Sequence, residues 1–190
     1  MLRLKDRAIG FCLGFILILA LTLHGFIVAF ADSTTGTATI NAGTLTETNA
    51  STPTVSATLN GTDQTVTYTL ALTLIDATGS GSGWHLTITS TTFTSGAPVH
   101  KLSTSASSLT GVTNTCVGGS SCTNPTNTIT YPVAVPAADT APTAVSFFNS
   151  AANTGMGKFT VTPTISIALP ANTYAGTYTS ILTLAVVSGP

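Results

Sequence analysis

Apolar and polar residues alternate with a period of two along much of the chain after residue 31. The clearest stretch is VTYTLALTL, residues 66–74, in which the even positions are apolar or aromatic and most odd positions are threonine. The same alternation recurs in WHLTI (84–88), ITYPVAV (129–135), FTVTPTISIAL (159–169) and YTSILTLAV (178–186). Successive side chains of a strand point to opposite faces, so this pattern predicts half-buried strands with threonine outward.

Weaker strand patterns appear in TATINAGTL (37–45), TVSATL (54–59) and AVSFF (144–148), with Gly, Pro, Asn and Ser clusters between them. No helical period appears after residue 31. Seven or more strands with polar outer faces predict an all-β fold, an antiparallel β-sandwich of immunoglobulin-like or Greek-key type. Pro163 interrupts one pattern, so we expect that strand to lie at a sheet edge or to carry a bulge.

The first 31 residues have the features of a secretory signal peptide, which would form a helix before the fold. MLRLKDR is basic, a long uncharged apolar run follows, and Ala29-Phe30-Ala31 supplies a small-residue cleavage site. The alternative is an uncleaved membrane anchor, because the apolar run is long for a signal. We therefore expect residues 1–31 as the signal, 32–36 as a flexible lead and 37–190 as one β-sandwich domain.

The chain beyond residue 31 carries very few charges. It contains two lysines and five acidic residues, which give it a net charge of −3. Nucleic acid is excluded as a partner because phosphate binding needs clustered Lys and Arg. Cys116 and Cys122 in CVGGSSC are separated by a short Gly-containing loop, which favours a disulfide over free thiols in an exported protein.

Signals for catalysis, cofactors and metals are missing from the sequence. Activation of a Ser, Thr or Cys nucleophile needs a base, and after residue 31 only His85 and His100 are available. His85 alternates with Trp84 and Leu86, so we expect it to face solvent, and His100 sits in a predicted loop or edge. No metal-ligand cluster and no phosphate or dinucleotide loop occurs. We therefore expect a protein that is not an enzyme and that needs no cofactor or metal.

The single tryptophan follows a glycine-rich connection. In DATGSGSGW, residues 76–84, Asp76 ends a strand pattern, and its carboxylate can accept hydrogen bonds from the backbone of the following turn. Trp84 begins an apolar stripe with Leu86 and Ile88, which favours a position in the core. The alternative is an exposed indole that stacks on a sugar beside the glycine loop.

These residues resemble the WxL domain of Gram-positive surface proteins. The segment 72–96 is similar to the first half of that domain, with an Asp at a strand end, a Gly-rich turn, Trp84-His85-Leu86 and then Phe93. The segment 169–190 resembles its Tyr-rich turn and final strand. The second Trp-x-Leu of the family reads Leu184-Ala185-Val186 here, so its tryptophan is missing.

The resemblance implies a secreted, non-catalytic protein that attaches non-covalently to the cell wall. Its ligand would be peptidoglycan or another cell-wall glycan, with other surface proteins as further partners and Trp84, Leu86 and Asp76 as the motif residues. A membrane would be involved only if the N-terminal segment is not cleaved. Two alternatives stay open. One is a self-assembling subunit of a surface fibre or surface layer, which fits exposed strand edges. The other is a glycan-modified adhesion module, which fits the threonine content.

Overall fold

The computed structural model describes residues 33–49 and 52–190. The chain divides into two units between Thr39 and Ile40, and the architecture below is that of residues 40–190. The described part is formed of strands, turns and extended segments and contains no helix, so none there is long and apolar enough to cross a membrane. The predicted signal helix and its cleavage site after Ala31 lie outside the described residues.

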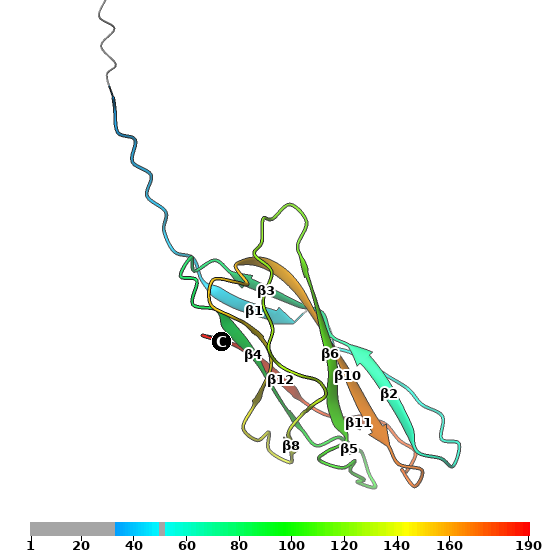
Figure 1. The fold of residues 1–190 in the computed structure, drawn as a ribbon. Coiled ribbons are helices and arrows are strands. Elements are labelled where there is room, and N and C mark those ends of the chain that lie inside the picture. Colours follow the sequence, from blue (N-terminus) through cyan, green and yellow to red (C-terminus); the bar gives the residue numbers. More distant parts are fainter. Residues whose placement is uncertain (1–32, 50–51) are drawn as a thin grey trace, which may run out of the picture. The chain divides into compact units, whose positions relative to one another are not determined.

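The strands fall into two larger sheets and one short pair (Figure 1). The first sheet holds β1 (Leu45–Asn49), β2 (Gln64–Thr69), β3 (Leu72–Asp76), β6 (Ser107–Cys116), β7 (Val133–Ala134) and β10 (Gly157–Leu169). The second sheet holds β4 (Trp84–Thr91), β8 (Ala137–Ala138), β9 (Val145–Ser150) and β12 (Leu182–Ser188). The short pair is β5 (Thr94–Ser95) with β11 (Tyr178–Thr179).

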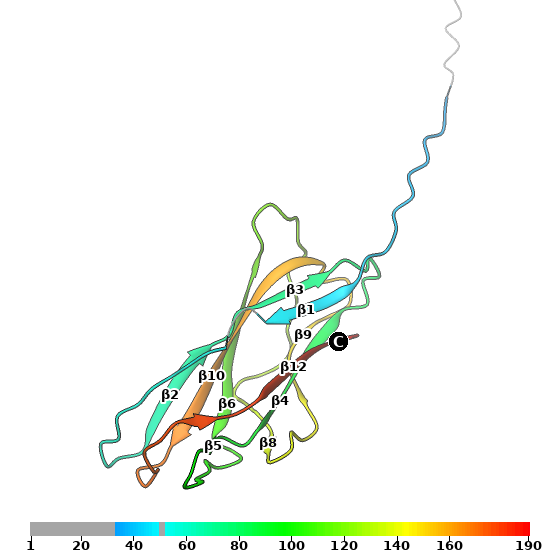
Figure 2. The same ribbon diagram turned by 180° about the vertical axis from the view of Figure 1, so that it is seen from behind.

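The long strand β10 organises the first sheet. Its first half pairs with β3 and its second half with β2, while β6 pairs along its other edge (Figure 2). β1 extends the sheet beyond β3. All of these pairings are antiparallel. A single 13-residue strand therefore holds both ends of the sheet together.

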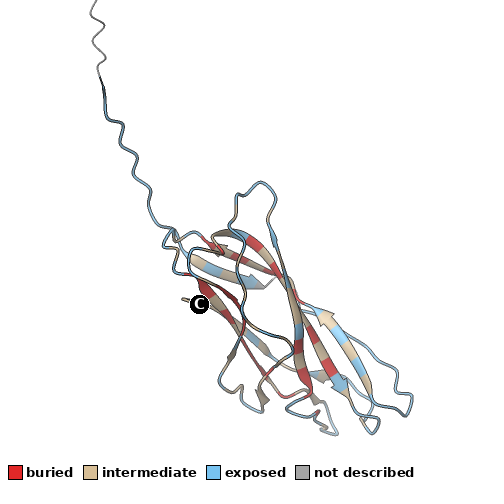
Figure 3. Cartoon of the chain, in the orientation of Figure 1, coloured by how far each residue is buried: buried red, intermediate tan, exposed pale blue. Residues whose placement is uncertain are grey.

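In the second sheet β4 is central, with β12 along one edge and β9 and β8 along the other. The pairing of β4 with β8 is parallel, and the other pairings of this sheet are antiparallel. The two sheets share one hydrophobic core. Side chains of β3, β6 and β10 meet those of β4 and β9 there, and the buried residues of these strands form lines along their inner faces (Figure 3).

The structure thus confirms the predicted all-β sandwich and the predicted faces of β4 and β10. The stretch ITYPVAV enters a strand only as β7, and YTSILTLAV is divided between β11 and β12. In β10 the odd positions from Phe159 to Ile167 are buried and the intervening threonines and serine are not. In β4, Trp84, Leu86 and Ile88 are fully buried. Threonine occupies the outer face because its branched side chain suits a strand and its hydroxyl can contact water.

The predicted strand VTYTLALTL is divided in two. It separates into β2 and β3 at Leu70–Ala71, where the Leu70 N–H donates to the carbonyl oxygen of Pro163 at 3.2 Å. Pro163 has no N–H to give to a neighbouring strand. The expectation that its strand lies at an edge is wrong, because β10 is central. The register with β6 shifts directly after it, between Thr164 and Ile165, as expected of a bulge.

Two of the three weaker strand predictions are wrong. Of TATINAGTL only Leu45 enters a strand, and TVSATL is extended but unpaired. The third, AVSFF, does form most of β9. Sequence alternation shows that a segment can be a strand, but pairing also needs a free neighbouring edge.

Cys116 and Cys122 form a disulfide at the end of β6. The loop that it closes lies against the start of β10, where Val117 N–H donates to Lys158 O at 2.9 Å and Thr123 N–H donates to Met156 O at 2.9 Å. The disulfide therefore holds the loop beside the segment that leads into the central strand.

Glu47 is the one acidic residue of β1. It lies two residues after Leu45 and therefore on the same face of the strand, and Leu45 packs against the main core. The Oε1 atom of Glu47 is buried without a hydrogen-bond partner in the described part of the chain. Burial disfavours the charged carboxylate, so it raises the pKa of Glu47 above its ordinary value.

This pKa shift predicts a pH dependence of stability. The folded state holds the proton more tightly than the unfolded chain, so stability falls as pH rises from about 4, the ordinary range of a glutamate, through the raised pKa. Replacing Glu47 by Gln removes the ionisation. We expect the melting temperature of E47Q to exceed that of the wild type at pH 7, with the gap closing toward pH 3.5. Equal gaps at both pH values would contradict this account.

Candidate functional site

The glycine-rich connection between β3 and β4 is a ladder of short hydrogen bonds. The Oδ1 atom of Asp76 accepts from the Thr78 N–H at 3.1 Å and from the Thr78 hydroxyl at 2.7 Å. The hydroxyls of Thr78, Ser80 and Ser82 then contact one another in sequence, each pair at 3.0 Å. Gly79, Gly81 and Gly83 all have positive φ, between 65° and 74°. Side chains two residues apart can meet because each intervening glycine adopts the left-handed conformation.

The chain enters the core at Trp84, directly after this ladder. The indole is fully buried, its Nε1–H donates to the carbonyl oxygen of Gly155 at 2.9 Å, and its ring lies 5.7 Å from the ring of Phe148. A Cβ on Gly155 would collide with Ser150 and would lie 2.7 Å from the indole nitrogen. The indole therefore occupies space that exists because residue 155 has no side chain.

The other motif residues are also inside the fold. Leu86 is fully buried, and Asp76 is only 4% exposed. β12 lies beside β4 with Val186 opposite Leu86 and Leu184 opposite Ile88. Leu184 and Val186 pack against the main core, so the segment that lacks the second tryptophan still supplies apolar side chains there.

His85 is partly buried rather than turned freely to solvent. Its Nδ1 lies 2.7 Å from the carbonyl oxygen of Gly189, which follows β12. The imidazole therefore links the start of β4 to the end of the last strand.

An aromatic pair with one exposed ring lies beyond the other end of β4, whose eight residues span roughly 25 Å. Tyr174 and His100 stack with ring centroids 3.8 Å apart and planes within 8° of parallel. Tyr174 is 63% exposed. We call this pair the Tyr174 platform.

Local hydrogen bonds hold the backbone at both residues of the Tyr174 platform. The His100 N–H donates to the Ser95 hydroxyl at 2.8 Å, and the Ser95 N–H donates to the His100 carbonyl at 2.9 Å. On the other side the Tyr178 hydroxyl donates to the Tyr174 carbonyl at 2.9 Å. Ser95 and Tyr178 are direct partners in the β5–β11 pair, so one strand pair positions the two rings.

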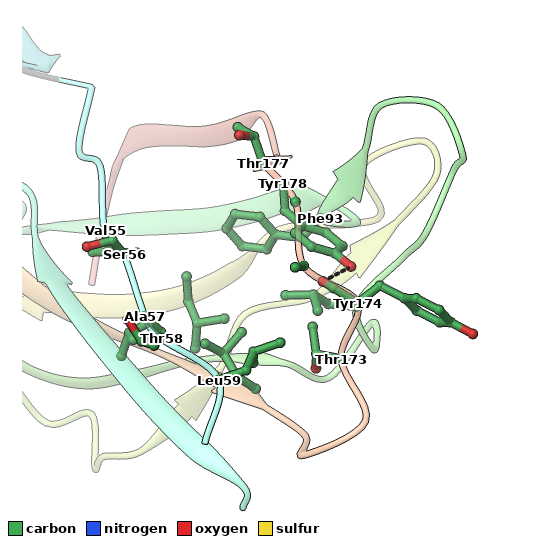
Figure 4. Close-up of a pocket in the computed structure, with 16 residues that line it drawn as sticks. Val55, Ser56, Ala57, Thr58, Leu59, Phe93, Thr173, Tyr174, Thr177 and Tyr178 are labelled. Atoms are coloured by element: carbon green, nitrogen blue, oxygen red, sulfur yellow. Dashed lines mark hydrogen bonds between the residues drawn. The ribbon is translucent and has the colours of Figure 1, made fainter. Parts of the chain in front are cut away.

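A groove of about 550 Å³ lies next to the Tyr174 platform. One wall is the extended segment 55–59, the other is the turn 173–178, and the floor is apolar (Figure 4). The side chain of Tyr174 points away from this groove, whereas Tyr178 and Phe93 lie over it. The aromatic pair and the groove are therefore adjacent but face different directions.

Charge contributes little to this end of the molecule. Lys101 and Asp139 form an ion pair at 2.7 Å beside His100, and both side chains are largely exposed, so we expect a small contribution to stability. Within residues 33–49 and 52–190, no three His, Cys, Asp or Glu side chains come together as a metal site would require.

Comparison with known families identifies the fold. Residues 28–190 match the model described as WxL domain surface cell wall-binding. The chain belongs to the WxL domain family. A search of curated proteins and a search of solved structures each gave no match. The family assignment places this WxL domain at the cell surface, with the cell wall as its partner.

The motif residues of this WxL domain do not lie on its exposed surface. Asp76, Trp84 and Leu86 come together around the start of β4, but they are all buried. The Tyr174 platform was not predicted, because its rings are 74 positions apart in the sequence and no periodic pattern links them. The signal available in the sequence was the Tyr-rich turn at 174–178, which marks a loop rather than a core position.

The burial of the Trp84 indole and its hydrogen bond to Gly155 lead to a prediction about stability. Replacing Trp84 by Ala removes a fully buried ring, so we expect a loss of about 3–5 kcal/mol in the free energy of unfolding. Replacing it by Phe keeps most of the volume but leaves the Gly155 carbonyl without its donor, at a cost of about 1–3 kcal/mol. Urea unfolding followed by circular dichroism would measure both. A cost below about 1 kcal/mol for the Ala variant would contradict a core position.

Proposed function

We propose that this WxL domain binds peptidoglycan non-covalently and without catalysis, and that the Tyr174 platform makes the contact. The family assignment supports the cell wall as the target. The exposed, stacked ring of Tyr174 is the observation that carries the choice of contact surface.

A glycan fits the chemistry of the platform. A pyranose ring presents a face of C–H groups, which packs on the flat face of an aromatic ring, while its hydroxyls need polar partners or water. Tyr offers both a hydrophobic body and a polar tip, which is why it is frequent where one side is apolar and the other wet. Thr173 and Thr177 in the same turn add hydroxyls.

Pre-ordering strengthens this assignment. His100 covers one face of Tyr174, and hydrogen bonds from Ser95 and Tyr178 fix the backbone on each side. A ring that is already held loses less conformational freedom on binding, so more of the contact energy appears as affinity. Trp84 offers no such surface, because its indole is fully buried and its N–H is already bonded to Gly155.

The absence of catalysis is supported by the environment of the two histidines. His85 contacts the Gly189 carbonyl and the ring of His100 stacks on Tyr174. Among the described residues, neither imidazole hydrogen bonds to a Ser, Thr or Cys side chain, which is the arrangement that an activated nucleophile needs.

Co-sedimentation with purified peptidoglycan sacculi tests this proposal on residues 32–190. We expect Tyr174→Ala to weaken binding at least about tenfold, equivalent to about 1.4 kcal/mol. Tyr174→Phe should retain most of the binding because the ring face remains. Val187→Ala, which trims an exposed apolar side chain on β12, is the matched control and should bind as the wild type does.

Two results would contradict the proposal. One is wild-type binding by a folded Tyr174→Ala variant. The other is the release of soluble muropeptides from sacculi during incubation with the protein, which would reveal hydrolysis.

A further inference from the structure

Two segments have the sequence of a strand but lie unpaired in the structure. Residues 37–42, TATINA, place apolar residues at the even positions, and residues 54–59, TVSATL, place them at the odd positions. Neither segment makes a backbone–backbone hydrogen bond to the rest of the described chain, and neither belongs to a strand. Each therefore has one apolar face and unused backbone donors and acceptors.

The first segment, which we call the arm, carries an unusually exposed hydrophobic side chain. Ile40 is 94% exposed, more than any other exposed large hydrophobic residue of the described chain. Ile40 is followed by Gly43, whose N–H donates to Ala77 O at 2.8 Å. The arm is therefore attached to the domain beside the end of β3.

The second segment, which we call the open edge, borders the groove. Val55, Ala57 and Leu59 line the groove, and Val55 and Leu59 are 42% and 38% exposed. The Thr58 carbonyl accepts a hydrogen bond from Gln64 Nε2 at 3.0 Å, which places this segment near the start of β2. Figure 4 shows the open edge running along one side of the groove.

The arm cannot pair along the open edge of its own domain, because the hydrogen bond of Gly43 holds its last residue beside the other end of β10. The arm joins the domain beside Asp76, which pairs with Gly157 at the start of β10, whereas Gln64 pairs with Leu169 at its end. The 13 residues of β10 span about 40 Å, and the six residues from Gly43 back to Thr37 reach at most about 20 Å.

We propose that the arm of one molecule adds as a strand to the open edge of a second copy. Ala38, Ile40 and Ala42 would then face the groove, beside Val55, Ala57 and Leu59. Strand addition satisfies the unused backbone groups and buries Ile40 in one step.

The chemistry of both segments favours this pairing. Exposed edges are usually protected by charged residues or proline, and neither 37–42 nor 54–59 contains one. Because the arm and the open edge lie at opposite ends of β10, the contact is head-to-tail and leaves a free arm and a free edge. A head-to-tail contact can repeat from one molecule to the next, so it produces linear chains of domains or, where the rotation between neighbours closes, rings.

Sedimentation velocity on residues 32–190 tests the assembly. The concentration should rise to about 1 mM, which is the dissociation constant expected of a weak association. We expect a series of oligomers that lengthens with concentration. Ile40→Asp, which disables the arm, and Ala57→Asp, which disables the open edge, should each be monomeric. An equimolar mixture of the two should form a 1:1 heterodimer and nothing larger, because only one intact arm and one intact edge remain.

Ile181→Asp is the matched control, since it removes a 70% exposed hydrophobic residue outside both segments. Assembly by Ile181→Asp as in the wild type supports the proposal. A monomeric wild type, equal loss of assembly in Ile181→Asp, or the absence of a heterodimer in the mixture would overturn it. Ile40→Asp should still sediment with sacculi, so this result is independent of wall binding.

Discussion

The hydrogen bond from Trp84 to Gly155 joins the β3–β4 connection to the β9–β10 connection, both of which pass from one sheet to the other. It fixes a large ring between β4 and the loop that leads into β10, the strand on which the first sheet depends. The ring and the backbone beside it fit because two glycines leave room for them. A Cβ on Gly83 would collide with the Ser150 carbonyl, and one on Gly155 would meet the Ser150 side chain and the indole nitrogen. The motif glycines and the motif tryptophan are therefore parts of one packing arrangement.

This arrangement changes what the motif means for function. A tryptophan in a wall-binding domain invites the interpretation that it stacks on sugar, but here the indole has neither a free face nor a free N–H. In the structure the motif joins strands, and in the function that we propose the wall is contacted by side chains that the fold exposes. Because the chain carries so few charges, the recognition that we propose depends on aromatic faces and hydroxyls.

Much of the fold could be predicted from the sequence because each strong strand covers one face of the core. The alternation in β10 and β4 identified their buried residues correctly, since a period of two fixes which side chains face inward. Pairing was harder to predict. TATINAGTL and TVSATL alternate as clearly as some paired strands, but whether a partner is available depends on tertiary structure. The division of VTYTLALTL also depends on an outside residue, Pro163 on β10.

The candidate site was less predictable than the fold for a related reason. Asp76 and Trp84 were visible because their motif is local, whereas Tyr174 meets His100 only through the pairing of β5 with β11. Ile40 shows the same limitation. The alternation around it predicted a strand of its own domain, whereas in the structure it is unpaired and exposed.

Because Trp84 is the only tryptophan, its fluorescence reports on the central claim without interference. We would measure acrylamide quenching of residues 32–190 with and without saturating peptidoglycan sacculi. The account predicts a blue-shifted emission that acrylamide quenches weakly and that sacculi leave unchanged. Strong quenching in the free protein that sacculi suppress would show that Trp84 contacts the wall, and would contradict it.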